Sequence, residues 1–213
     1  MNGTMTVNLS DLKHSLNLVV GPNNRGRGSR MPCAIGMSDT VRAPYPRQLL
    51  YGLSAGSAII LRHPDSQKLA ALANDTMQVA RRLRISVLIS SDPQIALRSG
   101  ADGVHLPEAA IRRRPNVSWA RLRPNWIITT SAHSAPAFRR AEAAGADGVL
   151  ISPVMPTASH PQNRPLGHLR FSALCHGHHI NVYALGGINS GNLRRLKGSG
   201  CQGIAGIGLF LKY

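Results

Sequence analysis

Short apolar runs alternate with helical or polar stretches along most of this chain. Runs of strand length that are apolar at successive positions are typical of parallel strands buried on both faces. Eight runs have this character, and we expect each to form a strand. They span residues 33–37, 57–61, 85–90, 103–106, 126–131, 148–152, 181–185 and 203–207.

Helical periodicity between these runs is clearest over Ser66–Leu83, where apolar side chains recur on roughly one face. Shorter patterns predict helices over 135–144 and 190–197, the second with Asn189 as its N-cap. Eight strands with seven intervening helices or turns, all in strand-then-helix order, favour a closed barrel over an open, doubly wound sheet. The sequence therefore predicts an α/β fold, a compact (β/α)₈ TIM barrel whose last helix is short or missing.

A seven-residue pattern occurs three times in the chain, as SGADGVH, AGADGVL and SGCQGIA. Each copy carries a glycine that suits the left-handed residue ending a helix, namely Gly100, Gly145 and Gly200. A predicted strand begins within three residues of each glycine, and these are the fourth, sixth and eighth strands. The repeat therefore marks equivalent helix-to-strand corners of one barrel.

The first thirty residues differ from the rest of the chain. Residues 22–30 (PNNRGRGSR) consist largely of Gly, Asn and Arg without periodicity, a composition that cannot bury enough surface to order itself. We therefore expect residues 1–30 to form a disordered extension, or to precede a true start at Met31 or Met37. Residues 31–213 are expected to form a single barrel domain.

Net charge and cysteine content limit the kinds of binding partner and the cellular compartment that we expect. The chain has 25 Lys and Arg against 9 Asp and Glu, a formal net charge of +16, which points to nucleic acid, an anionic membrane or an anionic substrate. The arginine clusters fall on different outer segments with few aromatic residues among them, which favours solvated faces over one nucleic-acid surface. Nucleic-acid binding stays open as an alternative carried by residues 1–30. Three scattered cysteines favour a reducing cytoplasm, no apolar run is long enough to span a bilayer, and a homo-oligomer stays open.

In a TIM barrel the functional site lies at the carboxyl ends of the strands. Two glycines follow the seventh strand and one follows the eighth, where backbone amides can bind a phosphate group: Gly186, Gly187 and Gly208. Arg62 follows the second strand and could bind a phosphate with two parallel hydrogen bonds. The alternatives are that the glycines only relieve tight turns and that Arg62 is an exposed loop residue.

Histidines supply the other candidate chemistry. His105 and His133 lie at the fourth and fifth strands and are either proton-transfer groups or hydrogen-bonded structural residues. A further group, 176–179 (HGHH), falls between the predicted sixth helix and the seventh strand, at the opposite end of the barrel. Its spacing matches no trusted metal-site pattern, so we interpret it as a solvated turn.

Three segments in order carry a resemblance to a known family: 101–106 (ADGVHL), then 131–134 (SAHS) with 152–159 (SPVMPTAS), then 184–188 (ALGGI) with Asn192. On these motifs the chain resembles the thiamine-phosphate synthase family and its thiazole-tautomerase relatives, from about the second strand to the C-terminus. The resemblance implies a cytoplasmic transferase that joins hydroxymethylpyrimidine diphosphate to a thiazole phosphate and releases diphosphate, with Mg²⁺ bridging the diphosphate.

The resemblance also implies roles for individual residues. Arg62 and Ser131 would hold the diphosphate. Thr157 and Ser159 would face the thiazole, and His160 stands where the family has a lysine. Gly187, beside Gly186, would hold the thiazole phosphate together with the backbone of Gly208. Asp92 and Glu108 are the carboxylates nearest to the positions of the family's Mg²⁺ ligands.

This chain departs from the family pattern at several positions. The family's Gln and Lys on either side of Arg62 are replaced by Ile60 and Pro64. Its Asn-Asp pair aligns with Ser90 and Ser91, and its second metal-binding Asp aligns with Ala110. Two alternatives therefore stand beside the synthase: a metal-independent thiazole tautomerase using His133 as acid and base, and a non-catalytic barrel that binds a phosphorylated ligand or nucleic acid.

Overall fold

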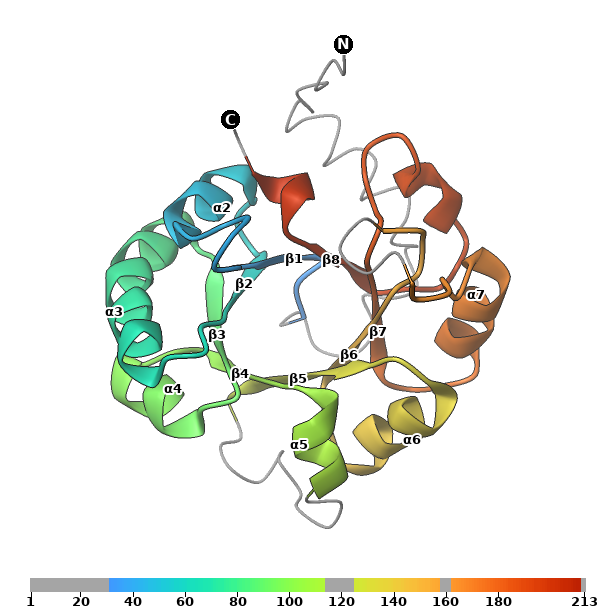
Figure 1. Ribbon diagram of the computed structural model, residues 1–213, viewed down its shortest axis with the longest axis horizontal. Helices are drawn as coiled ribbons and strands as arrows, with labels where there is room; N and C mark the ends of the chain where they lie inside the picture. The colour runs from blue at the N-terminus through green and yellow to red at the C-terminus, as the bar shows by residue number, and fades with distance from the viewer. Residues whose placement is uncertain (1–30, 114–124, 158–161, 212–213) are drawn as a thin grey trace.

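The protein forms a closed barrel of parallel strands with helices outside it, as the computed structural model in Figure 1 shows. The structure describes residues 31–113, 125–157 and 162–211. Strands β1 to β8 pair in chain order, and β8 closes the ring by pairing with β1. The predicted TIM barrel is confirmed. The strands are β1 (Ala34–Met37), β2 (Ala58–Leu61), β3 (Ser86–Ser90), β4 (Gly103–Leu106), β5 (Ile127–Ala132), β6 (Gly148–Ile151), β7 (Asn181–Leu185) and β8 (Gly203–Gly206).

Helices form the outer ring in Figure 1, one after each of the first six strands. After β7 and β8 the described chain forms only short 3₁₀ turns, η3 (Leu193–Leu196) and η4 (Gly208–Phe210). The expectation of a short last helix agrees with η4. The helices are α2 (Pro46–Gly52), α3 (Ser66–Leu83), α4 (Pro93–Ser99), α5 (Glu108–Arg113), α6 (Ala135–Ala143) and α7 (His168–His176).

Local signals fix the ends of the longest helix. The Asp65 carboxylate accepts a hydrogen bond from the Lys68 backbone N–H (2.9 Å) at the start of α3, and Arg84 in a left-handed conformation ends it. The helix predicted over 190–197 was wrong in type and extent, because only Leu193–Leu196 is helical and it is a 3₁₀ turn. Asn189 does accept a hydrogen bond from the Asn192 N–H (3.1 Å), so a capping contact exists but closes a tighter turn.

The barrel interior is packed with apolar side chains from alternating strand positions. Ile35, Ile60, Leu150 and Tyr183 belong to this inner cluster and are fully buried. The Tyr183 hydroxyl donates to the Pro32 carbonyl oxygen (2.7 Å), so the residues just before β1 also hold the barrel interior. The register between strands puts His105 beside Thr129 and Ser131 beside Leu150 on the same inner surface. One sector of the interior, at β4 and β5, is therefore polar.

The three-fold sequence repeat has a structural cause. Gly100, Gly145 and Gly200 all have positive φ, at 68°, 71° and 78°. Asp102 and Asp147 then each accept a hydrogen bond from a backbone N–H of the preceding strand, at Val87 and Ile128 (both 2.8 Å). The same two strand residues accept hydrogen bonds from the backbone N–H of the aspartates.

In the third copy, Gln202 stands at the aspartate position, and its amide donates to the Met31 carbonyl oxygen (3.3 Å). Strand residues in two copies also need to be glycine, because a Cβ at Gly103 or Gly203 would overlap the backbone of the neighbouring chain segment. The repeat therefore stabilises helix-to-strand corners and lies away from the carboxyl-end rim.

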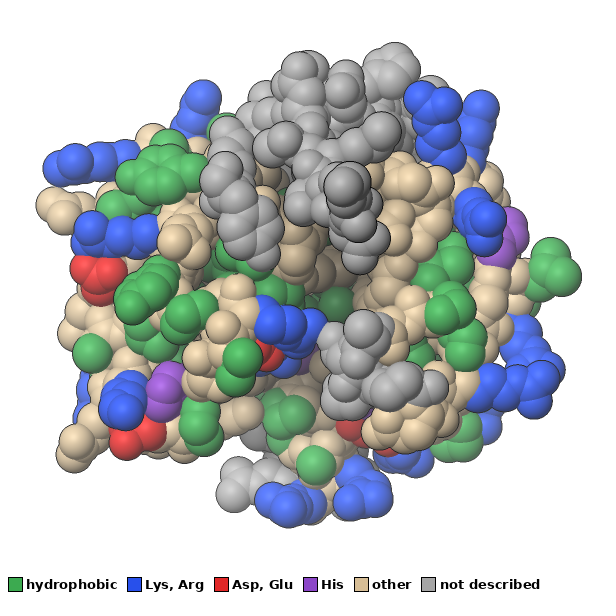
Figure 2. Space-filling model, turned by 45° about the horizontal axis from the view of Figure 1, so that its top comes forward, with side chains coloured by type: hydrophobic (Ala, Val, Ile, Leu, Met, Phe, Trp, Pro, Cys, Tyr) green, Lys and Arg blue, Asp and Glu red, His purple; other side chains and the backbone are tan. Residues whose placement is uncertain are grey.

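Basic side chains are spread over the outer surface. Figure 2 shows Lys and Arg separated around the face it presents, without one continuous basic stripe. The histidines at 176–179 also lie in the outer shell, where His178 Nδ1 lies 2.9 Å from Glu142 Oε2 and Phe138 contacts the His178 ring. Among the described residues, no helix combines the length and apolar character needed to cross a membrane. The predicted extension, residues 1–30, lies outside the described residues.

Candidate functional site

A cavity of about 290 Å³ opens at the carboxyl ends of the first three strands. A larger one of about 380 Å³ adjoins it on the outer side, between the β1–α2 loop and α3, and the two share Arg62. The smaller cavity lies at the barrel rim where function is expected, so we regard it as the candidate site. It is lined by Ser38, Asp39, Thr40, Arg62, His63, Pro64, Ser90 and Ser91.

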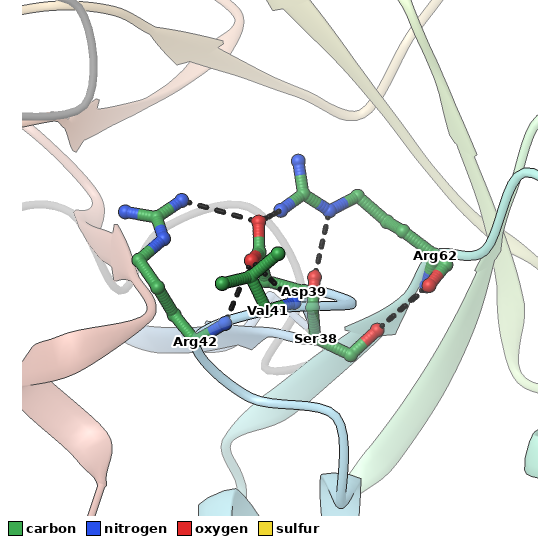
Figure 3. Close-up of polar contacts among 5 residues, drawn as sticks. All are labelled: Ser38, Asp39, Val41, Arg42 and Arg62. Carbon is green, nitrogen blue, oxygen red and sulfur yellow. Dashed lines mark hydrogen bonds and ion pairs between the residues drawn. The ribbon is translucent and has the colours of Figure 1, made fainter.

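Arg62 is held in place by the β1–α2 loop (Figure 3). Its Nε donates to the Ser38 carbonyl oxygen (2.9 Å), and its Nη2 lies 3.4 Å from Asp39 Oδ2. The Ser38 hydroxyl also exchanges hydrogen bonds with the backbone of Arg62. Arg42 approaches the Asp39 carboxylate from the other side, at 3.2 Å. The guanidinium is therefore oriented by the protein before any ligand binds.

The charges in this group shift one another's pKa values. Burial alone would raise the pKa of Asp39, but hydrogen bonds from Arg42 and from the Val41 N–H, with the charge of Arg42, lower it to about 2. Burial lowers the pKa of Arg62, and Asp39 opposes this effect. Asp39 is therefore ionised at neutral pH, and Arg62 keeps its charge because arginine starts from a very high pKa.

His105 links two strands inside the barrel. Its Nδ1 lies 3.0 Å from Thr129 Oγ1 and its Nε2 lies 2.9 Å from Ser131 Oγ. The residue is only 3% exposed. Burial lowers the pKa of His105 to about 3, and the charge of Arg62 acts in the same direction. The imidazole is therefore neutral at physiological pH.

Arg62 and Ser131, two of the predicted site residues, come from separate strands of the barrel wall. Arg62 leaves β2 and Ser131 belongs to β5, on opposite sides of the two intervening strands. Arg62 acts electrostatically on His105, and His105 contacts the Ser131 hydroxyl. The Ser131 side chain is half-buried, which leaves it accessible from the rim.

His133 and Glu108 form a second polar group at the ends of β4 and β5. One carboxylate oxygen, Glu108 Oε2, accepts hydrogen bonds from the His133 backbone N–H (3.0 Å) and from His133 Nδ1 (2.9 Å). The other oxygen lies 3.6 Å from Arg140 Nη2. The His133 side chain is 55% exposed, so its Nε2 can reach a ligand. Glu108 therefore orients His133 at the rim.

Asp92, the other predicted metal ligand, is the N-cap of α4. Its Oδ1 accepts hydrogen bonds from the Gln94 and Ile95 backbone N–H groups, at 2.9 and 3.0 Å. No group of three or more His, Cys, Asp or Glu side chains suited to a metal occurs in the described part of the chain. With Asp92 capping a helix and Glu108 paired to His133 and Arg140, these carboxylates as arranged do not fit a Mg²⁺ site.

Ser91 shows backbone strain at the same rim. Its φ is 68°, in the left-handed region that Asn and Asp adopt more readily than Ser does. Its N–H donates to the His105 carbonyl oxygen (2.9 Å), which holds the residue in this conformation. Strain of this kind often marks functional loops, and here it borders the cavity.

The two glycines after β7 pack tightly against the β6–α7 loop. Both have positive φ, 88° at Gly186 and 70° at Gly187. A Cβ at Gly186 would lie 2.9 Å from Pro153 Cα, and one at Gly187 would overlap the Pro156 carbonyl oxygen. Asn192 donates to the Gly187 carbonyl oxygen (2.7 Å). Turn conformation and packing therefore require both glycines, whatever ligand they bind.

Gly208 differs from these two glycines. A Cβ there would meet no atom within 4 Å, and its φ lies outside the left-handed region. It begins η4 directly beyond β8, so its backbone is open to the rim. Thr157 lies in the β6–α7 loop and is half-buried, whereas Ser159 and His160 lie outside the described residues.

The sequence analysis did not identify the residues that orient the predicted site residues. Ser38 and Asp39 orient Arg62, and Thr129 holds His105. A signal for the first pair was present, since both residues directly follow the first predicted strand and must reach the same rim. Thr129 gave no signal, because a threonine inside a strand is ordinary.

A TIM barrel with an oriented arginine on one side of its rim and glycine-rich loops after β7 and β8 is typical of proteins that bind small phosphorylated molecules. The sequence profile described as thiamine monophosphate synthase matches residues 36–210. The chain therefore belongs to the thiamine monophosphate synthase family, as the resemblance predicted.

Individual relatives agree with this assignment. The chain is 37% identical over 154 residues to "Putative thiamine-phosphate synthase 2" of Aquifex aeolicus, covering 71% of this chain and 81% of that one. It is 32% identical over 162 residues to the thiamine-phosphate synthase of Chlorobium phaeobacteroides, covering 74% and 78%. The solved thiamine phosphate pyrophosphorylase of Pyrococcus furiosus superposes with a TM-score of 0.68 at 25% identity, covering 84% of this chain and 86% of that one.

Proposed function

We propose that the protein joins hydroxymethylpyrimidine diphosphate to a thiazole phosphate. The bond between the pyrimidine methylene carbon and the diphosphate oxygen breaks first, and its electron pair leaves with the diphosphate. The thiazole nitrogen then donates its lone pair to the resulting carbocation, which forms the new carbon–nitrogen bond. The main catalytic demand is stabilisation of negative charge on the departing diphosphate.

The single observation that carries this proposal is the guanidinium of Arg62, which Ser38 and Asp39 hold in a fixed orientation beside the cavity at the rim. Arg62 supplies a fixed cation, and Ser131 supplies a hydroxyl for the departing diphosphate. Because Asp39 and Ser38 already orient the guanidinium, little reorganisation is needed as charge develops. Beyond β7 and β8, the backbones of Gly187 and Gly208 would hold the thiazole phosphate, with Thr157 facing the ring.

Mg²⁺, when bound, would neutralise the diphosphate charge. Asp92 and Glu108 do not fit this role as arranged, so we assign the charge neutralisation that the chain itself supplies to Arg62. Whether turnover depends on Mg²⁺ is part of the test below.

The test is product formation from both substrates, measured discontinuously with Mg²⁺ and again with EDTA. Arg62→Ala should lower kcat by about 100-fold or more, because it removes the fixed cation. Arg42→Ala is the matched control, since Arg42 also contacts Asp39 but is 49% exposed, and it should leave kcat within about threefold. No product from the wild-type protein under either condition, while it still binds thiazole phosphate, would contradict the synthase and leave a ligand-binding or tautomerase role.

A second function is favoured by one specific contact, the hydrogen bond between His133 and Glu108. An ionised carboxylate can only accept, so Nδ1 carries the proton and Nε2 is left as a base. In a thiazole tautomerase, His133 Nε2 would take a proton from one carbon of the thiazole phosphate and return it to another. This reaction needs neither the pyrimidine nor a metal.

Exchange of thiazole protons with D₂O, followed by NMR, tests this second function. His133→Ala and Glu108→Gln should both slow exchange if the tautomerase proposal is right, the first by about 100-fold. Arg62→Ala should leave it unchanged. Exchange that is insensitive to His133→Ala would rule out the proposed role of this histidine.

A further inference from the structure

His105 is a polar side chain of the barrel interior that touches Ser131, one of the proposed ligand-binding residues. It is buried, and both ring nitrogens contact hydroxyl groups of β5, at Thr129 and Ser131. Its strand neighbour on the other side, Ser90, is paired with it in register at the end of β3. The charged group that acts on it most is Arg62.

A neutral imidazole has one N–H donor and one acceptor nitrogen, so the two hydroxyls must play opposite parts. If Nε2 accepted from Ser131, the Ser131 proton would point into the barrel and only an oxygen lone pair would face the rim. If Nε2 carries the proton, Ser131 accepts from it and its own O–H is free to donate outward. Thr129 then donates to Nδ1.

We propose that His105 is a positioning residue: as the tautomer protonated at Nε2, it donates to Ser131 Oγ and so directs the Ser131 hydroxyl proton toward the bound diphosphate. The inference rests on the proposed function, because it takes Ser131 as a diphosphate ligand. Among the described residues, His105 is the hydrogen-bond partner of the Ser131 hydroxyl, so this contact sets the direction of its proton.

Two conservative variants separate the two contacts of His105. The side-chain amide of Gln reaches the position of Nε2, whereas that of Asn reaches the position of Nδ1. His105→Gln should therefore keep the contact with Ser131, and His105→Asn should keep only the contact with Thr129. We expect inorganic diphosphate to bind about tenfold more weakly to His105→Asn and within about threefold of wild type to His105→Gln, measured by titration calorimetry.

A double variant tests whether His105 acts through Ser131. Ser131→Ala should weaken diphosphate binding by about as much as His105→Asn does, and the two changes combined should cost no more than Ser131→Ala alone. Additive losses, or equal losses in His105→Asn and His105→Gln, would mean that His105 is only a packing residue.

The tautomer can be measured on the unmodified chain, so the test does not depend on variants that fold. In ¹⁵N-histidine NMR of the wild-type protein, His105 should show the Nε2–H tautomer between pH 5 and 9. Thr129→Val should reduce this preference, since it removes the donor to Nδ1. A wild-type Nδ1–H tautomer would overturn the inference.

The outcomes for this inference and for the synthase proposal can be told apart. A wild-type protein that binds no diphosphate and forms no product overturns the proposed function, and with it the purpose assigned to this contact. A wild-type protein that binds diphosphate, together with an unchanged His105→Asn variant, overturns the inference about His105 alone.

Discussion

At the scale of single residues, the site depends on how Arg62 is held. Two of its donor groups are already engaged, Nε with Ser38 and Nη2 with Asp39. The remaining N–H groups form the part of the guanidinium that can face an anion. The negative charge of Asp39 reduces the net positive charge at the rim, but its ion pair fixes the orientation of the Arg62 guanidinium. Asp39 also lies between Arg62 and Arg42.

Asp39 should contribute stability that disappears in acid. Its pKa is about 2 in the folded protein and near 4 when unfolded, so its contribution is present above about pH 4 and is lost as the pH falls through 2. We expect Asp39→Asn to lower the free energy of unfolding by about 1 to 2 kcal/mol at pH 7, a difference that shrinks between pH 4 and 2.

Urea denaturation at several pH values measures this difference. Asp75→Asn is the matched control, because Asp75 pairs with Arg47 at the surface and should matter less. A difference between wild type and Asp39→Asn that stays constant down to pH 2 would show that the pKa of Asp39 is not lowered.

Which residues could be predicted depended on whether the chain itself carried a signal. Ser131 stood out because it begins one of the segments that carry the family resemblance, and Arg62 because it directly follows the second strand. The ligand-binding roles of both residues stay predictions. Asp92 and Glu108 were chosen for their chemistry, but sequence spacing does not show that a carboxylate is already capping a helix or paired with a histidine. The hydrogen-bond partners of these carboxylates become visible only in the folded structure.

At the scale of elements, the β6–α7 and β7–η3 loops pack together as one unit. Val154 and Met155 donate backbone hydrogen bonds to the Leu185 and Gly186 carbonyl oxygens, at 2.9 and 3.1 Å. This pairing brings the Thr157 loop beside the glycines proposed to hold the thiazole phosphate. A substitution that moves the backbone of one loop should therefore also shift the backbone of the other.

Two glycine substitutions should separate packing from ligand binding. Gly187→Ala should lower the free energy of unfolding by about 2 to 4 kcal/mol, because the residue has positive φ and its Cβ would overlap Pro156. Gly208→Ala should change stability by less than about 0.5 kcal/mol, since its Cβ meets open space.

Gly208→Ala should instead raise the KM for thiazole phosphate about tenfold, because a methyl group would stand between the backbone and the phosphate. Thermal unfolding and steady-state kinetics on the two variants make the comparison. An unchanged KM in Gly208→Ala would remove Gly208 from the proposed phosphate site.

The predictability of elements followed their length. The α3 bounds agree with the predicted Ser66–Leu83 because eighteen residues display the helical period and both ends carry caps. Helices α2 and α4 have only seven residues each, too few for a clear period. The turn at 193–196 became 3₁₀ because the two asparagines, Asn189 and Asn192, bind each other's backbone and shorten it.

At the scale of the whole molecule, the strand order was predictable because every strand is a buried apolar run. The closing contacts were not, because they join residues from the two ends of the described chain. Tyr183 binds Pro32, and Gln202 binds Met31. Residues 31 and 32 therefore belong to the barrel interior as much as β1 does.

Truncation of the chain should show how much residues 31 and 32 contribute to stability. A chain beginning at Met31 should keep its fold, whereas one that also lacks residues 31 and 32 should be less stable by about 1 to 3 kcal/mol, because the buried Tyr183 hydroxyl would lose its acceptor. Urea denaturation of both chains measures the difference. Equal stability would show that this hydrogen bond has a replacement.

The net charge of +16 should produce only non-specific attraction to nucleic acid, since described basic residues are divided among α3, α5, α6 and η3. In fluorescence anisotropy with a short RNA, a chain of residues 31–213 should bind weakly, without sequence preference, and lose binding between 50 and 200 mM salt. RNA binding that the full chain shows and that is lost on removing residues 1–30 would support the nucleic-acid alternative instead.

The corners at Asp102, Asp147 and Gln202 differ in the part of the chain that their side chains bind. Two of them turn their side chain back to the preceding strand, and the third turns it toward the start of the chain. Gln202 directly precedes β8, the strand that pairs with β1. Its side chain therefore ties the last strand of the ring to the residues before the first strand.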